Sequence, residues 1–429
     1  MRIHIKNAMI VTMNTGDEPY EGDILIEEDR IAKMGVELRE EADECINAHG
    51  MVAMPGLINT HQHSPMSLLR AFSDDLKLMD WLERKMLPAE DRMTPEDMYW
   101  GAKLAIAEMI KSGTTTFADM YVHMDQIAEA VSETGIRASL TRGLIGLEDD
   151  GGQRLAEGLK LIRRWSGQAE GRITTMMGPH APYTCPPEFM KEVMGLAKDT
   201  GVPVHIHLAE TVEETVKIKA RYNCTPTQYL YELGLFEHHH VLLAHAVHLN
   251  REDVALLKGM KGGIAHNPVS NLKLGCGITP VLDMLGQGTI VGLGTDGAGS
   301  ATTLDLFEEI KAAAWLQKLS TGNPAAFTAA QALQMATVNG AKLLNLEHET
   351  GTLEVGKKAD IILLDMQKPH LQPIHQIESL LAYSINGADV DTTIVNGRVL
   401  MRGRHLLTID EKEVLAQATV RGNRIVQGL

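Results

Sequence analysis

The feature that most constrains the fold is an alternation of strand and helix through the middle of the chain. Eight short apolar or β-branched runs lie between residues 52 and 297, and stretches with helical patterns separate them: VAMPGLINT, GTTTFADMY, RASLTRGLI, RITTMMGPH, VPVHIHLAE, HVLLAHAVHL, GGIAHNP and TIVGLGTDG. Eight strands that are each followed by a helix, within about 300 residues, are what a (β/α)8 TIM barrel requires. A doubly wound open sheet is the alternative, but its first strand would lead into a Gly-rich phosphate loop, and NTHQHS is not one.

The clearest helical pattern is TPEDMYWGAKLAIAEMIKSG. Thr94 is a good N-cap, Pro95 suits the first helical position, and Gly113 is a suitable stop. Apolar residues recur on one face of this stretch: Met98, Ala102, Ala105, Met109 and Ile110. The spacing predicts a helix that begins at Pro95 and ends before Gly113.

The two ends of the chain differ from its middle. Short strand-like segments bounded by Gly, Asp and Asn occur in RIHIKNAMIVTMN and GDILIEEDRIAKMG near the start, and in ADIILLDM and DVDTTIVNGRVLMRGR near the end. Such segments are typical of an antiparallel sandwich. Neither end alone is long enough for one, so we expect residues 1–54 and 357–429 to form one small composite β-sandwich domain. The catalytic barrel of residues 55–356 would be inserted between them.

Composition excludes some classes of function. The chain is 44% hydrophobic and 22% charged, which is ordinary for a globular protein with a sizeable core. Its formal net charge of -16 argues against a nucleic-acid partner, which would need a basic face. The four cysteines are scattered without a C-x-x-C pair, the N-terminus has no signal-peptide pattern, and no apolar run could span a bilayer. We expect a cytoplasmic protein without a membrane partner; a homo-oligomer is left open.

Polar side chains gather where the eight runs end. In a (β/α)8 barrel, catalytic groups lie at the C-terminal ends of the strands. The polar residues that follow the runs are His61 and His63 after the first, Arg142 after the third, His180 after the fourth, His207 and Glu210 after the fifth, His245 after the sixth, His266 after the seventh and Asp296 after the eighth. Residues without a shared function would be scattered along strands and helix surfaces instead.

Four of these side chains suit a metal ion. His61 and His63 are two residues apart, so on a strand both point to one face. Imidazole suits zinc, and a catalytic zinc keeps one position open for water. Alone, H-x-H is a weak signal, and two solvated loop histidines are the alternative. His207 on another strand and Asp296 in GLGTDG strengthen the metal hypothesis, although an ordinary Asp-Gly turn would also explain Asp296.

Three further histidines have no assigned role. His205 shares a strand face with His207 but lies one layer deeper, so we expect a hydrogen-bonded core histidine. His266 is a candidate for a position behind the metal ligands, and His248 is left unassigned.

The motifs together resemble a known family. PGLINTHQHSPMSLLR, LPAEDRMTPEDMYWG, TRGL, GPHAPYTC, HIHLAE, LLAHAVHL, AHNPVSNLKLGCGI and GLGTDGAGS look like the amidohydrolase superfamily and, within it, the 5'-methylthioadenosine/S-adenosylhomocysteine deaminases. The resemblance covers essentially the whole chain, including the split sandwich, and GKKADIILLD near the end is typical of the superfamily. The set in this order is specific, whereas any single motif is not.

The resemblance implies a mononuclear zinc site, with iron or another divalent ion as the alternative. Binuclear relatives carry a carbamylated lysine on the fourth strand, and RITTMMGPH has no lysine. The implied metal ligands are His61, His63, His207 and Asp296. The implied catalytic residues are Glu210, as general acid and base, together with His245 and Asp296. Among the implied substrate contacts, Glu90 would bind a ribose, and Arg142, Arg154 and His180 would contact the ring or tail. Glu210 and Asp296 would also contact the substrate.

The resemblance therefore predicts an enzyme that hydrolytically deaminates a small-molecule nucleoside. Its products would be ammonia and an inosine analogue, made from 5'-methylthioadenosine, S-adenosylhomocysteine, adenosine or 5'-deoxyadenosine. Alternatives remain open: Glu90 as a surface carboxylate, Arg142 in a structural ion pair, and a guanine, cytosine or triazine substrate. A catalytically silent barrel is a further alternative, but it would be expected to lose ligands that are all present here.

Overall fold

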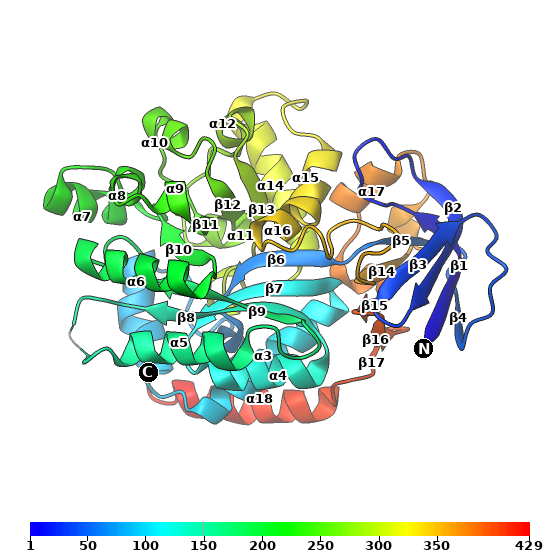
Figure 1. Cartoon of the computed structure of the whole chain (residues 1–429), viewed down its shortest axis with the longest axis horizontal. Helices are drawn as coiled ribbons and strands as arrows, with labels where there is room; N and C mark the ends of the chain where they lie inside the picture. The colour runs from blue at the N-terminus through cyan, green and yellow to red at the C-terminus, as the bar shows by residue number, and fades with distance from the viewer. Residues whose placement is uncertain (149) are drawn as a thin grey trace.

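Eight parallel strands form a sheet in which each strand lies beside the next in chain order (Figure 1). They are β6 (Leu57–Gln62), β7 (Thr114–Tyr121), β8 (Arg137–Leu144), β9 (Ile173–Pro179), β10 (Val204–Leu208), β11 (His240–His245), β12 (Lys261–His266) and β13 (Ile290–Leu293). Each corresponds to one of the eight runs in the sequence, so the predicted (β/α)8 barrel is confirmed. The computed structural model describes residues 1–148 and 150–429.

Specific hydrogen bonds join the first strand of the barrel to the last. The Thr60 hydroxyl donates to the Leu293 carbonyl oxygen at 2.8 Å. Farther along, the Asn59 side-chain amide donates to the Thr295 hydroxyl at 2.8 Å, and the Asp296 N–H donates to the His61 carbonyl oxygen at 2.9 Å. Side chains thus supplement the main chain in closing the barrel at its C-terminal edge.

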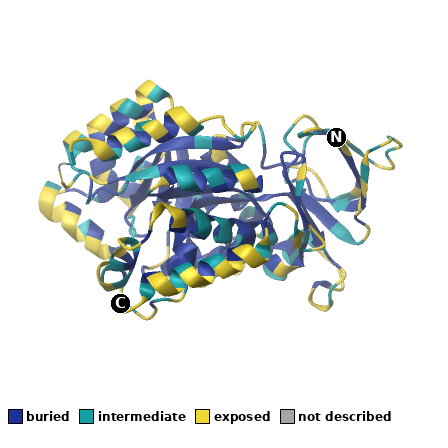
Figure 2. Ribbon diagram, turned by 90° about the horizontal axis from the view of Figure 1, so that it is seen from below, coloured by how far each residue is buried: buried dark blue, intermediate teal, exposed yellow. Residues whose placement is uncertain are grey.

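Helices pack around this barrel with one side buried and the other exposed (Figure 2). The longer ones are α3 (Pro95–Lys111), α4 (Met124–Thr134), α5 (Gln153–Trp165), α6 (Pro187–Thr200), α7 (Val212–Tyr222), α8 (Pro226–Glu232), α14 (Leu306–Thr321), α15 (Ala329–Met335), α17 (Ile377–Tyr383) and α18 (Glu411–Val426). The short ones are η1 (Ser64–Leu69), α1 (Leu78–Trp81), η2 (Leu82–Met86), α2 (Leu87–Glu90), α9 (Leu235–His238), α10 (Arg251–Leu256), α11 (Pro268–Lys273), α12 (Val281–Gly286), α13 (Ala298–Ala301), α16 (Val338–Leu343), η3 (Pro369–Leu371) and η4 (Gly387–Asp389).

The prediction for α3 is confirmed. It begins at Pro95 after the N-cap Thr94, which forms a reciprocal capping box with Asp97, and Gly113 follows its end with a φ of 88°. The predicted apolar face of α3 is buried. Among the residues that the structure describes, no helix has both the length and the apolar character to cross a bilayer.

A second, mixed sheet combines the two ends of the chain, at the right of Figure 1. Its strands are β1 (Arg2–Ile10), β2 (Tyr20–Glu27), β3 (Arg30–Gly35), β4 (Glu44–Asn47), β5 (Met51–Pro55), β14 (Ile361–Asp365), β15 (Val390–Val395), β16 (Arg398–Arg402) and β17 (His405–Leu406). The antiparallel pair β5–β14 joins the N-terminal strands to the C-terminal ones. Most pairs are antiparallel, as expected, but β1 runs parallel to β4 and β5. On this basis we propose the domain division into 1–54 plus 357–429 and 55–356.

One buried ion pair connects the two sheets. Arg137, at the start of β8, donates from Nε and Nη2 to the two carboxylate oxygens of Asp360 at 2.8 and 3.0 Å. Both side chains are almost fully buried. The Asn396 N–H also donates to Asp360, at 2.7 Å. The pair therefore fixes β8 of the barrel against the segments that flank β14 and β15.

The C-terminal helix α18 lies along the barrel rather than beside the mixed sheet (Figure 1). Arg421 pairs with Asp97 of α3 at 3.1 Å, and Arg424 pairs with the same carboxylate. Arg92 donates to the main-chain oxygens of Ile425 and Gln427 at 3.2 and 2.8 Å. This helix therefore also holds the chain segment that follows α2.

Replacing Arg137 by Met should destabilise the protein strongly, because Asp360 would keep a buried charge without its partner. We expect a loss of about 3–5 kcal/mol in the free energy of unfolding. Chemical denaturation measures it. Arg2→Met is the control, because Arg2 pairs with Glu27 at the surface, and it should cost at most about 1 kcal/mol. Equal losses in both variants would contradict the assigned role of the buried pair.

Candidate active site

Three imidazoles meet at the C-terminal edge of the barrel. His61 lies near the end of β6, His207 near the end of β10, and His245 is the last residue of β11. The ring of His61 has its centroid 4.9 Å from that of His207 and 5.4 Å from that of His245. One ligand atom from each of the three lies within 4.8 Å of the others, so together they can hold a metal ion.

His63 and Asp296 complete the predicted set of ligands. His63 lies just past β6, where it is the N-cap of η1, and its ring centroid is 4.9 Å from that of His61. Its Nε2 atom is 3.3 Å from Asp296 Oδ1. His61, His63 and Asp296 also offer ligand atoms within 4.8 Å of one another. The structure thus brings the four proposed ligands together from strands far apart in the sequence.

The histidines are oriented for metal binding. Nδ1 of His63 lies 2.6 Å from the Met120 carbonyl oxygen, and Nδ1 of His207 lies 2.8 Å from the His180 carbonyl oxygen. A carbonyl oxygen only accepts, so each Nδ1 carries the hydrogen and each Nε2 keeps its lone pair. Nε2 of His61 is buried and makes no hydrogen bond to the described residues. Three imidazole nitrogens and one carboxylate form a donor set that fits zinc.

Asp296 is held as a carboxylate by its neighbours. The hydroxyls of Ser270 and Ser300 donate to Oδ2 at 2.6 and 2.7 Å. Burial would raise the pKa of Asp296, but the imidazoles of His63 and His245 and the two hydroxyls outweigh it and lower the pKa. Its backbone has a φ of 61°, which is unusual for a residue with a side chain. The ionised form is therefore favoured.

The chain passes close to the metal ligands just before Asp296. A Cβ atom on Gly294 would meet Asn267 Oδ1 at 2.4 Å and the His61 backbone at 2.8 Å. Only glycine fits there without displacing the ligand strand.

Glu210 lies in the opposite electrostatic environment. It follows β10, and its Oε1 atom is 3.8 Å from Nδ1 of His245. Burial raises the pKa of Glu210, and the negative charge of Asp296 adds to this effect. Its N–H donates to Glu214 Oε2 at 3.1 Å. Glu210, His245 and Asp296 offer ligand atoms within 4.8 Å of one another, so the predicted proton carrier lies beside the metal cluster.

His245 is oriented by an asparagine. Its Nδ1 lies 3.0 Å from Asn271 Oδ1, and its Nε2 is buried without a hydrogen bond to the described residues. Burial lowers the pKa of His245, but the carboxylates of Glu210 and Asp296 outweigh burial and raise it. The imidazole is thus placed to hydrogen-bond a group bound between the metal and Glu210.

Glu90 lies in the wall next to the cluster. It is the last residue of α2, and the hydroxyl of Tyr121 donates to its carboxylate. The ring centroid of Tyr121 is 6.0 Å from that of His63. Burial raises the pKa of Glu90. These contacts argue against the alternative of a freely solvated surface carboxylate.

His180 also adjoins the cluster. Its ring centroid is 5.0 Å from that of His207, and its Nδ1 lies 2.9 Å from the Thr184 hydroxyl. Burial, followed by the nearby His63, lowers the pKa of His180 to about 4. The ring is therefore neutral near pH 7 and can either donate or accept a hydrogen bond.

The two arginines make different contacts. Arg142 pairs with Glu157 of α5, from Nε and Nη2 to Oε2 at 2.9 Å each. Arg154 lies 3.6 Å from Asp150 and donates to the Ile145 carbonyl oxygen at 3.1 Å. Within the described residues, the hydrogen-bond and ion-pair partners of both side chains thus lie in β8, in α5 and in the loop between them. The ion pair anticipated as the alternative for Arg142 is present.

Several residues that support the site were not anticipated. They are Tyr121 at the end of β7, Glu214 in the first turn of α7, and Ser270, Asn271 and Ser300 around Asp296 and His245. A signal existed for two of them, because HNPVSN places polar side chains directly after the seventh strand. Tyr121, Glu214 and Ser300 carried no comparable signal, because neither their residue type nor their spacing marks them as partners of the site.

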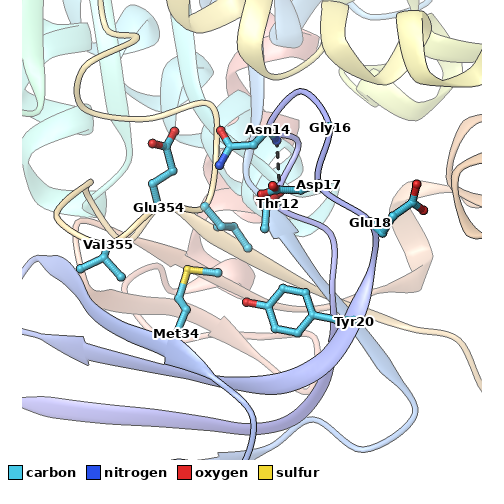
Figure 3. Close-up of a pocket in the computed structure, with 10 residues that line it drawn as sticks. Thr12, Asn14, Gly16, Asp17, Glu18, Tyr20, Met34, Glu354 and Val355 are labelled. Carbon is cyan, nitrogen blue, oxygen red and sulfur yellow. Dashed lines mark hydrogen bonds between the residues drawn. The ribbon is translucent and has the colours of Figure 1, made fainter.

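A cleft of about 540 Å³ lies away from this cluster, beside the mixed sheet (Figure 3). Thr12, Asp17 and Glu354 are among its lining residues. The Thr12 hydroxyl donates to Asp17 at 2.8 Å, and the Asn14 N–H donates to Thr12 at 3.2 Å. No histidine lines the cleft among the described residues, so the imidazole cluster is the better candidate site.

The sequence profile of the amidohydrolase family matches residues 52–400. The chain belongs to the amidohydrolase family. The matched range contains all the proposed ligands, together with the strands that carry them.

Individual amidohydrolases match over the full length. The chain is 50% identical to a 5-methylthioadenosine/S-adenosylhomocysteine deaminase of Desulforudis audaxviator, with 100% of both chains covered. It is 49% identical to a 5'-deoxyadenosine deaminase of Methanosarcina acetivorans, with 99% of this chain and 98% of that one covered. The crystal structure of an adenosine deaminase from Xanthomonas campestris with bound zinc is 30% identical and has a TM-score of 0.95, covering 99% and 98% of the two chains.

The buried carboxyl group of Glu214 should make stability depend on pH. Burial raises its pKa to about 7. The folded state then keeps a proton that the unfolded state, with a pKa of about 4.3, has already released. The free energy of unfolding should therefore fall as pH rises from about 4.3 to about 7, by about 3–4 kcal/mol from this group.

Chemical denaturation of the metal-free protein at several pH values in this window tests the expectation. Glu214→Gln should flatten the slope, because the amide does not titrate and its oxygen can still accept from Glu210. Glu213→Gln is the matched control on an exposed neighbour and should leave the slope unchanged. A slope that is the same in all three proteins would contradict the raised pKa.

Proposed function

We propose that this protein hydrolytically deaminates adenosine derivatives, releasing ammonia and the inosine analogue. The observation that carries the proposal is the position of Glu210 and His245 beside the cluster of His61, His63, His207 and Asp296. The full-length relatives that are named as deaminases of adenosine derivatives support it. In the overall reaction, water supplies the oxygen that becomes bonded to C6 of the purine, and the C6–N bond breaks.

We propose zinc as the metal, held by His61, His63, His207 and Asp296. The donor set and the orientation of the imidazoles support it, as does the zinc in the related crystal structure. Bound zinc would lower the pKa of a coordinated water to about 7 and so supply a nucleophile at neutral pH. Iron or another divalent ion with the same preference for imidazole remains the alternative.

The two carboxyl groups divide the proton transfers. Burial raises the pKa of Glu210 toward the range that suits a general acid, so Glu210 can give a proton to ring nitrogen N1, which makes C6 electrophilic. Because its pKa is lowered, Asp296 stays ionised and can accept a proton from the attacking water. His245 lies close to both carboxyl groups and can hydrogen-bond the oxygen that adds to C6. Ammonia then leaves after a proton reaches the amino group.

Glu90 and His180 make a nucleoside the favoured substrate. A carboxylate can accept hydrogen bonds from both hydroxyls of a ribose, and Glu90 is already held near the cluster by Tyr121. His180 is neutral and lies against His207, so it can hydrogen-bond the sugar or ring. A free base would leave the partly buried Glu90 without a hydrogen-bonding partner from the substrate.

We propose that Arg142 binds the carboxylate tail of a substrate, with Arg154 as a second candidate. S-adenosylhomocysteine has such a tail, whereas 5'-methylthioadenosine and 5'-deoxyadenosine have none. The planar fork of arginine binds a carboxylate in a bidentate manner, and Glu157 already provides a carboxylate for it in this structure. A substrate with a carboxylate tail would have to displace Glu157 from Arg142. The strength of this ion pair therefore affects the preference between substrates with and without the tail.

Glu210→Gln should retain the metal and lose turnover, because the amide cannot transfer a proton. We expect kcat to fall about 10²- to 10⁴-fold. Loss of absorbance at the adenine band and release of ammonia measure turnover, and elemental analysis measures the metal. A near-normal rate with full metal content would remove Glu210 from the proton pathway. A wild-type protein with zinc but no reaction on any adenosine derivative would refute the proposed function.

Arg142→Ala should impair S-adenosylhomocysteine far more than 5'-methylthioadenosine. Loss of a charge-assisted contact to the tail should lower kcat/KM for the tailed substrate at least about tenfold, with little change for the other. The measurement is kcat/KM for both substrates in the wild type and the variant. Equal losses on both would mean that Arg142 serves only the structural pair with Glu157.

A further inference from the structure

A further histidine, His205, lies directly behind the proposed metal cluster. His205 is two residues before His207 on β10, so both side chains face the barrel interior, and His205 is fully buried. Its Nε2 atom is 2.9 Å from Nδ1 of His61, and the two rings meet edge to face with centroids 5.0 Å apart. On its other side, its Nδ1 atom is 3.4 Å from the Thr141 hydroxyl oxygen. The expected hydrogen-bonded core histidine is confirmed, and its partner is a proposed metal ligand.

This arrangement differs from that of the other histidine ligands. His63 and His207 both direct Nδ1 at a carbonyl oxygen, which can only accept and so allows one tautomer. His61 instead faces another imidazole, which either donates or accepts according to its own tautomer. If His205 donated to Nδ1 of His61, the neutral His61 would carry its hydrogen on Nε2 and would have no lone pair for a metal.

We propose that His205 is the positioning residue that fixes His61 in its metal-binding tautomer. Nε2 of His205 accepts from Nδ1–H of His61, and Nδ1–H of His205 is directed to the Thr141 hydroxyl. The lone pair on His61 Nε2 is then directed at the cluster. The buried Nε2 atom of His61, which makes no hydrogen bond to the described residues, matches this arrangement. His205 thus raises metal affinity without touching the ion.

The inference rests on the metal site of the proposed function and not on the identity of the substrate. Neighbouring groups that orient ligand histidines typically change metal affinity 10- to 100-fold when they are replaced. The other partners of this kind are backbone oxygens, which no substitution removes. Replacing His205 therefore changes the orientation of His61 while all four proposed ligands stay in the protein.

The test is the zinc affinity of the full-length protein, measured by competition with a chromophoric chelator. His205→Leu removes the acceptor and should weaken zinc binding about 10- to 100-fold. His205→Gln places an amide oxygen near the position of Nε2 and should restore affinity to within a few-fold of the wild type. His240→Leu is the matched control, because His240 lies at the opposite end of β11 and bonds the Leu343 oxygen at 2.8 Å; it should bind zinc normally.

Thr141→Val gives an independent measurement if His205→Leu does not fold, as judged by circular dichroism and thermal unfolding. It removes the hydroxyl that faces Nδ1 of His205 and should weaken zinc binding by a smaller factor in the same direction. Normal zinc affinity in a folded His205→Leu protein would overturn the proposal, as would a Gln variant as weak as the Leu variant. Without a folded Leu variant, normal affinity in Thr141→Val would overturn it.

The outcomes remain separate from those for the proposed function. A wild-type protein that binds zinc with the expected dependence on His205 but deaminates no adenosine derivative would refute the proposed reaction and support this inference. A wild-type protein that deaminates adenosine derivatives, and whose zinc affinity does not change when His205 is replaced, would support the proposed function and overturn this inference. A wild-type protein without measurable zinc affinity would overturn the inference.

Discussion

The hydrogen bond from the Asp296 N–H to the His61 carbonyl oxygen is the contact on which the site depends. It joins the first and last strands of the barrel at the edge where the catalytic groups lie. The same two residues contribute an imidazole and a carboxylate to the metal cluster, so closing the barrel and assembling the ligands are one event. Gly294 permits this approach, because any side chain there would meet the His61 backbone. The closed barrel therefore fixes the positions of the His61 and Asp296 side chains relative to each other.

The surroundings of the cluster shift the pKa values of two carboxyl groups in opposite directions. Asp296 receives two hydroxyl hydrogen bonds and lies among imidazoles, which lower its pKa. Glu210 is buried near that negative charge, and its pKa is raised. Groups of one chemical type can thus serve as base and acid in a single pocket. His245, the last residue of β11, lies close to both carboxyl groups, and its Nδ1 atom is 3.8 Å from Glu210 Oε1.

Much of the site could be predicted from the sequence because strand ends are visible in it. Apolar runs stop where polar residues begin, and parallel strands bring those ends to one edge, which places His61, His207 and Asp296 together. Loop paths are not encoded by periodicity, so the partners of these residues were not evident. Glu157 meets Arg142 only because α5 packs over the end of β8. His205 was correctly expected in the core, but its partner His61 lies on β6, a strand that is not paired with β10, and the sequence does not show which side chains meet across the barrel.

The anchoring of the segment after α2 by α18 has a consequence for the order of folding. Arg92 reaches oxygen atoms that lie 333 and 335 residues farther along the chain, and Glu90 is two residues before it. Contacts of such long sequence separation carry a large cost in loop-closure entropy, because a long intervening chain must be ordered when they form. During synthesis, the metal ligands of the early strands emerge long before this anchor does. The wall proposed to bind ribose can therefore reach its final position only after every residue of the proposed metal cluster, the last of which is Asp296, has been made.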